Sequence, residues 1–94
     1  MVNRMFLFIL LPFDQGAGMT IEEAFGQTIR EIRKSKNLSQ EALSDLSRLD
    51  RTFISHLECG NKQPSLITIF QLAEAFNISA TSIISMVEER IHSK

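Results

Sequence analysis

Apolar residues recur at spacings of three and four along most of the chain that follows Gly18. Such spacing places them on one side of an α-helix. Each stretch of this kind begins after a residue whose side chain can accept a hydrogen bond from the free backbone amides of a first helical turn. The predicted amino-terminal caps are Thr20, Ser39, Asp50, Ser65 and Ser79. We therefore predict five short helices, the first opened by a capping box of Thr20 and Glu23.

The same pattern predicts which side chains face the core. Helix by helix, the expected inward positions are Ile21, Phe25, Ile29 and Ile32; Ala42, Leu43 and Leu46; Phe53, Ile54 and Leu57; Ile69, Leu72, Ala73 and Phe76; and Ile83, Ile84, Val87 and Ile91. Asn37, Gly60 and Asn77 stand where left-handed residues commonly end helices. The main body contains no credible strand. The sequence predicts an all-α bundle of five helices joined by tight turns.

Residues 1–19 differ from the rest, and we treat them as an apolar amino-terminal extension ahead of a domain at residues 20–94. Residues 5–11 form an unbroken apolar run that ends at Pro12. Seven residues are too few to span a bilayer, which needs about twenty, and the flanks make a poor signal peptide. The extension is either a segment upstream of a true start at Met19 or a structural segment. In the second case we expect it to pack on its own domain or to pair with a partner's copy.

Length and charge limit the possible functions without choosing one. Ninety-four residues support one compact domain, and a domain of this size gains stability from dimerisation. The net charge of −1 does not indicate a nucleic-acid partner. Residues 30–62, however, hold seven basic and five acidic side chains, an excess of two positive charges. A nearly neutral protein can therefore still present a basic face to phosphates.

No arrangement of residues for catalysis or metal binding is evident. Cys59 is the single cysteine, which excludes an internal disulfide and suits a reducing, cytoplasmic location. His56 and His92 lack the spacing of metal ligands, and Cys59 near His56 has no third group to orient it as a nucleophile. The chain also has no Gly-rich phosphate loop. We predict a protein that is not an enzyme, with no cofactor, no metal and no evident small-molecule effector.

The informative stretch runs from residue 39 to residue 58, where two short helices flank a tight turn. On a helical wheel, Phe53, Ile54 and Leu57 occupy one side of the second of these helices. The roughly opposite side carries the hydrogen-bonding residues Arg51, Thr52, Ser55 and His56. A major groove is wide enough to admit a helix, and such side chains match the donors and acceptors on base edges.

Three motifs stand out along the chain: LSQEAL at residues 38–43, ISHLECG at residues 54–60 and PSLITIFQLAEAF at residues 64–76. Through them residues 24–84, about two thirds of the chain, resemble the phage-repressor-like helix-turn-helix family, also called the XRE or Cro/repressor family. The stretch RLDRTFIS at residues 48–55 further resembles controller proteins of restriction-modification systems. The resemblance implies a five-helix, lambda-repressor-like DNA-binding fold.

The resemblance also implies roles for single residues. Gln40 matches a residue that binds phosphate and braces the recognition helix. Arg51, Thr52 and His56 match base-contacting positions with Ser55 beside them, and Asn61 and Lys62 match a loop that meets phosphate. Arg33 and Glu58 match a structural pair between the first and third helices. The chain departs from the family pattern at Arg48, where the turn usually has Gly, and at Phe53, where controller proteins often have Tyr.

We therefore expect a transcriptional regulator that binds double-stranded DNA as a homodimer on a pseudo-palindromic operator. The broad apolar stripe of the last helix is the expected dimer interface, in part shared with the core. It consists of Ile83, Ile84, Met86, Val87 and Ile91. The alternative is an antitoxin or another protein-interaction module that neutralises a partner and regulates its own synthesis. A regulator tethered to the membrane by residues 5–11 is a third reading, which the shortness of that run disfavours.

Overall fold

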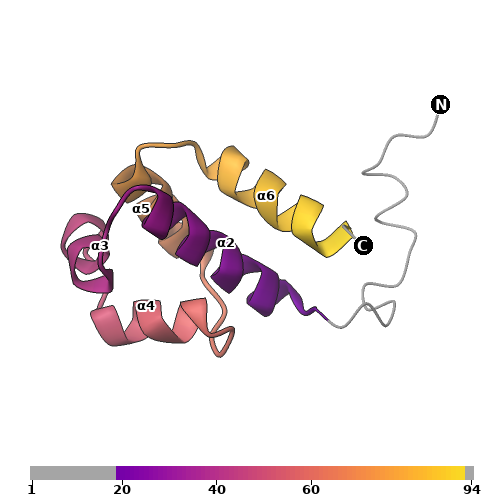
Figure 1. Cartoon of the computed structure of the whole chain (residues 1–94), viewed down its shortest axis with the longest axis horizontal. Helices are drawn as coiled ribbons and strands as arrows, with labels where there is room; N and C mark the ends of the chain where they lie inside the picture. Colours follow the sequence, from indigo (N-terminus) through magenta and orange to yellow (C-terminus); the bar gives the residue numbers. More distant parts are fainter. Residues whose placement is uncertain (1–18, 93–94) are drawn as a thin grey trace.

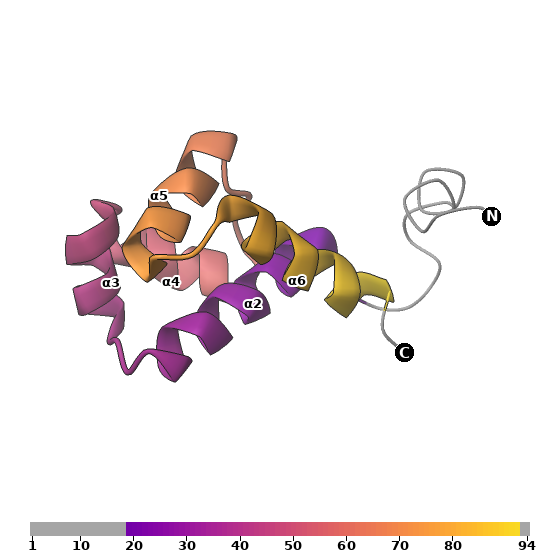
Figure 2. The same ribbon diagram turned by 90° about the horizontal axis from the view of Figure 1, so that it is seen from above.

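The computed structural model describes residues 19–92, which form the five helices of an all-α bundle (Figures 1 and 2). They are α2 (Ile21–Ser35), α3 (Gln40–Ser47), α4 (Arg51–Glu58), α5 (Leu66–Phe76) and α6 (Ala80–His92). The predicted number and order of helices are confirmed. The apolar run at residues 5–11 lies outside the described residues, so its expected packing stays a prediction.

Side-chain caps begin the helices where the sequence predicted them. The Thr20 hydroxyl accepts a hydrogen bond from the backbone amide of Glu23, whose carboxylate accepts one in return from the amide of Thr20, both at 3.0 Å. The other capping side chains are those of Ser39, Asp50, Ser65 and Ser79. Left-handed residues follow the helices at Asn37, Arg48, Gly60 and Asn77. Local chemistry thus sets the start and the end of most helices.

The core lies between the helices. Helix α2 packs between α6 and α4, and α5 packs against both α3 and α6 (Figure 1). The fully buried large side chains of the core include Ile29, Leu43, Ile54, Leu72 and Phe76. Arg90 joins α6 to α2 through a hydrogen bond from its Nε to the Thr28 hydroxyl at 3.2 Å. Each Å² of apolar surface that is buried stabilises the fold by about 25 cal/mol. Burial of this cluster is therefore the main stabilising contribution to the fold.

Several predicted orientations are wrong. Leu46 is 56% exposed because Leu43 and Ser47, on the adjacent side of α3, are the residues that turn inward. Ile21 and Ile84 are also exposed rather than buried. Ile83 and Val87, by contrast, are buried in the core as the helical pattern predicted. Their expected part in a dimer interface stays a prediction.

No single helix among residues 19–92 is long and apolar enough to cross a membrane. Taken together, α5 and α6 reach that length and composition, but a bend of 107° separates them. Part of this apolar composition lies in the core, where Leu72 and Phe76 of α5 and Ile83 and Val87 of α6 are buried.

Gly26 is buried in the middle of α2, where this helix passes over the end of α4. A Cβ atom built on Gly26 would lie 2.3 Å from the carbonyl oxygen of Leu57 and 2.8 Å from that of Glu58. Real contacts of a Cβ atom do not reach such distances, so only glycine lets the two helices approach this closely. The position of α4 against the core therefore depends on a residue without a side chain.

Replacing Gly26 with alanine is expected to destabilise the protein, although alanine is the better helix former. The clash is with backbone atoms that cannot rotate away, and overpacking of this kind costs about 1–3 kcal/mol. Chemical denaturation of Gly26→Ala should therefore give a lower free energy of unfolding than the parent chain. Arg30→Ala, at an exposed position of the same helix, is the control and should change the free energy of unfolding little. A Gly26→Ala protein as stable as the parent would show that α2 and α4 can separate freely.

Candidate nucleic-acid interface

Helices α3 and α4 and the three residues between them form a helix-turn-helix unit at one end of the molecule (Figure 1). Arg48 ends α3 in the left-handed region with φ of 61°, which turns the chain sharply. Asp50 then caps α4 by accepting hydrogen bonds from the backbone amides of Thr52 at 3.0 Å and Phe53 at 3.3 Å. The backbone of Arg48 thus adopts a conformation that favours glycine, the residue usual at this turn position, and it carries the mild strain of a non-glycine residue there.

The two sides of α4 meet different surroundings. Ile54 and Leu57 are fully buried against the core, and Phe53 is half-buried at its edge. Arg51, Thr52 and His56 are exposed, and Ser55 beside them is half-buried. Within the described residues, the side of α4 that carries the hydrogen-bonding groups is therefore open, as a helix that enters a groove requires.

A nearly buried ion pair holds α4 against α2. The side chains of Arg33 and Glu58 are 11% and 4% exposed. Arg33 donates two parallel hydrogen bonds to the carboxylate of Glu58. One runs from Nε to Oε2 at 2.7 Å, and the other from one terminal nitrogen to Oε1 at 3.0 Å. The other terminal nitrogen donates to the carbonyl of Leu38 at 2.8 Å. The hydrogen bond to Glu58 raises the pKa of the Arg33 guanidinium, outweighing the opposite effect of burial, so the guanidinium stays charged.

Gln40 links this ion pair to the exposed side of α4. Its amide nitrogen donates to Glu58 Oε1 at 3.0 Å, and its amide oxygen accepts a hydrogen bond from Arg51 at 3.3 Å. A carboxylate oxygen of Glu41 lies 3.8 Å from Nε of Arg51. The first turn of α3 thus restrains the arginine that begins α4. Gln40 therefore contacts both ends of α4, with Arg51 at its start and Glu58 at its end.

Asn61 and Lys62 are exposed in the loop that follows α4. Gly60 begins this loop with φ of 77°, and a Cβ atom on it would lie 3.0 Å from the side chain of Glu23. The amide of Asn61 donates to the carbonyl of His56 at 2.9 Å. The loop is therefore fixed to the end of α4, and it keeps both polar side chains on the surface beside that helix.

Helix α5 carries an exposed apolar surface that the sequence pattern did not predict. Leu66, Ile67 and Phe70 are 70%, 73% and 58% exposed, more than any apolar residue of α6. We call these three side chains the α5 face. The signal was present in the sequence, because the stretch LITIF has too many apolar residues for one side of a helix.

The described part of the chain gives little support for a metal site or a catalytic site. No group of three or more His, Cys, Asp or Glu side chains within residues 19–92 is arranged to hold a metal ion. Cys59 is exposed and has a free thiol.

Comparison with known proteins identifies the family. Residues 29–83 match the family described as Helix-turn-helix. The chain is 36% identical over 67 residues to the control protein C.SmaI of Serratia marcescens, a match that covers 71% of this chain and 80% of that protein. It is also 39% identical over 61 residues to the control protein C.BamHI of Bacillus amyloliquefaciens, covering 64% of this chain and 75% of that protein.

Solved structures show the same fold. The restriction-modification controller protein C.AhdI of Aeromonas hydrophila is 42% identical, with a TM-score of 0.65 over 66% of this chain and 94% of that one. These matches confirm the predicted lambda-repressor-like fold and the resemblance to controller proteins. They also confirm the prediction that the protein is not an enzyme, because the family consists of regulators. The chain belongs to the XRE family of helix-turn-helix transcriptional regulators, which bind DNA.

Proposed function

We propose that the protein regulates transcription as a homodimer that inserts two copies of α4 into successive major grooves of a pseudo-palindromic operator. The observation that carries this proposal is the open polar side of α4, held in place by Gln40, Glu58 and Arg33. A dimer of this kind places its recognition helices about one turn of DNA apart, roughly 34 Å.

Arg51 is the proposed main reader of sequence. It begins α4, where the recognition helices of this class contact base edges, and its side chain is about half exposed. Its guanidinium can donate two hydrogen bonds to one guanine, the commonest specific contact in a major groove. Thr52, Ser55 and His56 extend the same side of the helix and are the proposed further contacts.

Gln40, Asn61 and Lys62 are the proposed phosphate contacts. They lie at the start of α3 and in the loop after α4, so they flank the recognition helix on both sides. Contacts to the DNA backbone position a protein without reading its sequence. They also release counterions, which makes binding weaken steeply as salt rises.

The α5 face is the proposed dimer interface, in place of the α6 stripe expected from the sequence. Ile83 and Val87 of that stripe are buried, whereas Ile84 and Met86 are only about two fifths exposed. A two-fold interface uses the same surface on both subunits, and three large apolar side chains on one helix form a surface that can pack on its own copy. Burying them removes from water the three most exposed of the large apolar side chains among the described residues.

Arg51→Ala is expected to weaken binding to the preferred operator by about 1–3 kcal/mol and to relax the base preference at the position that Arg51 reads. The physical reason is the loss of a two-bond contact to a base edge. Selection of bound DNA from a random pool, followed by titration of the selected site, measures both effects for the parent and the variant.

Lys62→Ala is the matched control, because it removes one positive charge outside α4. It should weaken binding to all sequences equally and reduce the salt slope by about 1. Unchanged selectivity in Arg51→Ala, together with the parent's affinity, would remove Arg51 from the proposed base contacts.

Ile67→Asp is expected to convert the dimer into monomers, because the substitution places a charge at the centre of the α5 face. Sedimentation of the free protein would show the smaller species, and footprinting would show binding reduced to single half-sites. Met86→Asp is the comparison variant on α6 and should remain dimeric. The assignment to α5 fails if Met86→Asp dissociates the protein and Ile67→Asp does not.

A further inference from the structure

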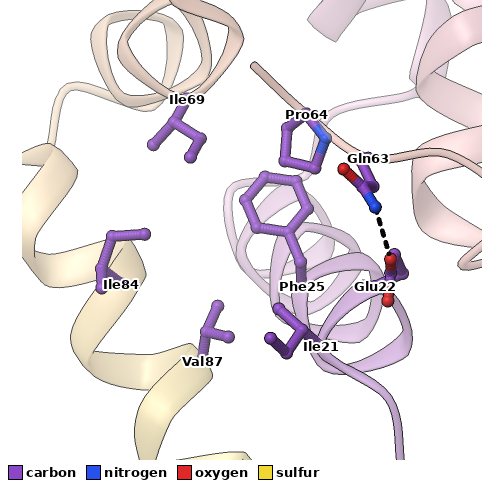
Figure 3. A pocket seen from close by; sticks show the side chains of 8 residues that line it. All are labelled: Ile21, Glu22, Phe25, Gln63, Pro64, Ile69, Ile84 and Val87. Atoms are coloured by element: carbon purple, nitrogen blue, oxygen red, sulfur yellow. Dashed lines mark hydrogen bonds between the residues drawn. The ribbon is translucent and has the colours of Figure 1, made fainter. Parts of the chain in front are cut away.

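A pocket of about 290 Å³ lies between the first turns of α2, the loop before α5, and the facing sides of α5 and α6 (Figure 3). Its walls are apolar and come from Phe25, Pro64, Ile69 and Val87, with Ile21 and Ile84 beside them. The ring of Phe25 lies beside Pro64 in the wall of the pocket (Figure 3). This pocket is separate from the polar side of α4, and the proposed DNA binding does not use it.

The pocket leaves apolar surface in contact with water. Ile21 is 42% exposed and Ile84 is 41% exposed. One edge is polar, where the amide of Gln63 donates to the carboxylate of Glu22 at 3.0 Å. An occupant with apolar side chains and a positive charge at one end matches both features.

We propose that this pocket binds the chain's own apolar segment at residues 5–11. The segment contains seven consecutive apolar residues, including Phe6 and Phe8, and Arg4 precedes it. Its side chains match the apolar walls, and Arg4 supplies a positive charge that can approach Glu22. Aromatic rings contribute the most buried apolar area per side chain, so Phe6 and Phe8 are the proposed contacts.

The connection between the segment and the pocket is short. Only residues 12–19 separate the apolar run from Thr20, and Ile21 of the adjoining first turn already lines the pocket. Eight extended residues reach at most about 26–29 Å, and Gly16 and Gly18 allow the chain to turn back. A tether of this length keeps the segment at millimolar effective concentration near the pocket. A free ligand or a separate partner has no such advantage.

The test compares methyl spectra of full-length chains labelled with ¹³C at isoleucine. Phe6→Asp/Phe8→Asp should shift the methyl resonances of Ile21, Ile69 and Ile84, because these methyl groups lose the ring currents and contacts of the docked aromatic residues. The buried core methyl group of Ile54 should not move. The double variant should also unfold several degrees lower, since the apolar contacts are lost.

Asn3→Asp/Gln15→Glu is the control, because it adds the same two negative charges to the extension outside the apolar run. It should leave all these resonances in place. Pocket resonances that are identical in the parent and in Phe6→Asp/Phe8→Asp would overturn the proposal.

A mixed sample separates docking within one chain from exchange between two chains. A labelled parent chain is mixed with an excess of unlabelled Phe6→Asp/Phe8→Asp chains and allowed to re-equilibrate. Docking of the chain's own segment predicts parent resonances that do not change. Resonances that move to the positions of the variant would show that the partner's segment fills the pocket, and this result would also overturn the proposal.

Discussion

The ion pair of Arg33 and Glu58 is the interaction on which the position of α4 depends. It joins α2 to the last residue of α4, and Glu58 also accepts the hydrogen bond from Gln40 at the start of α3. Three helices therefore meet at one carboxylate. Removing one partner of a pair this well buried costs about 3–5 kcal/mol, because the other charge is left without compensation. The pair contributes orientation more than net stability, since charged groups lose much of their hydration when they are buried.

Gly26 and Arg33 act on the end of α4 from positions of α2 that are seven residues apart. The glycine lets the backbone of α2 approach the carbonyl oxygens of Leu57 and Glu58, and Arg33 then reaches the carboxylate of Glu58. A larger residue at position 26 would separate the helices and lengthen the contacts of Arg33. The close approach and the ion pair therefore support each other. Together they fix the orientation of α4 on α2, and with it the direction in which the polar side of α4 faces.

Helix boundaries were predictable because they depend on local chemistry. The caps at Thr20, Ser39 and Asp50 are short-range hydrogen bonds that a sequence shows directly. The division of α4 into a buried and an open side was predictable for the same reason, because it follows from helical periodicity. The contact between Arg33 and Glu58 spans 25 positions and came only from the family resemblance.

Orientation at the margins of the core was not predictable in this way. A helical wheel gives the relative directions of side chains but not which neighbouring helix is present to cover them. Leu46 lies on the flank of a short helix, where Ser47 takes the inward place and Gln71 donates to its carbonyl. The role of Gly26 was missed because a glycine inside a helix is locally unfavourable. Only the packing of α2 on α4 explains its presence.

The exposed apolar side chains follow from the size of the domain. A domain of fewer than one hundred residues buries only about two thirds of its unfolded surface, so apolar residues on several sides of α5 cannot all face one core. Leu72 and Phe76 are buried, Ile69 lines the pocket, and Ile67 is left in water. Apolar surface that one small core cannot cover becomes available for association. Because the α5 face and the pocket have different residues, a second copy of the chain can cover the first while the chain's own extension covers the second.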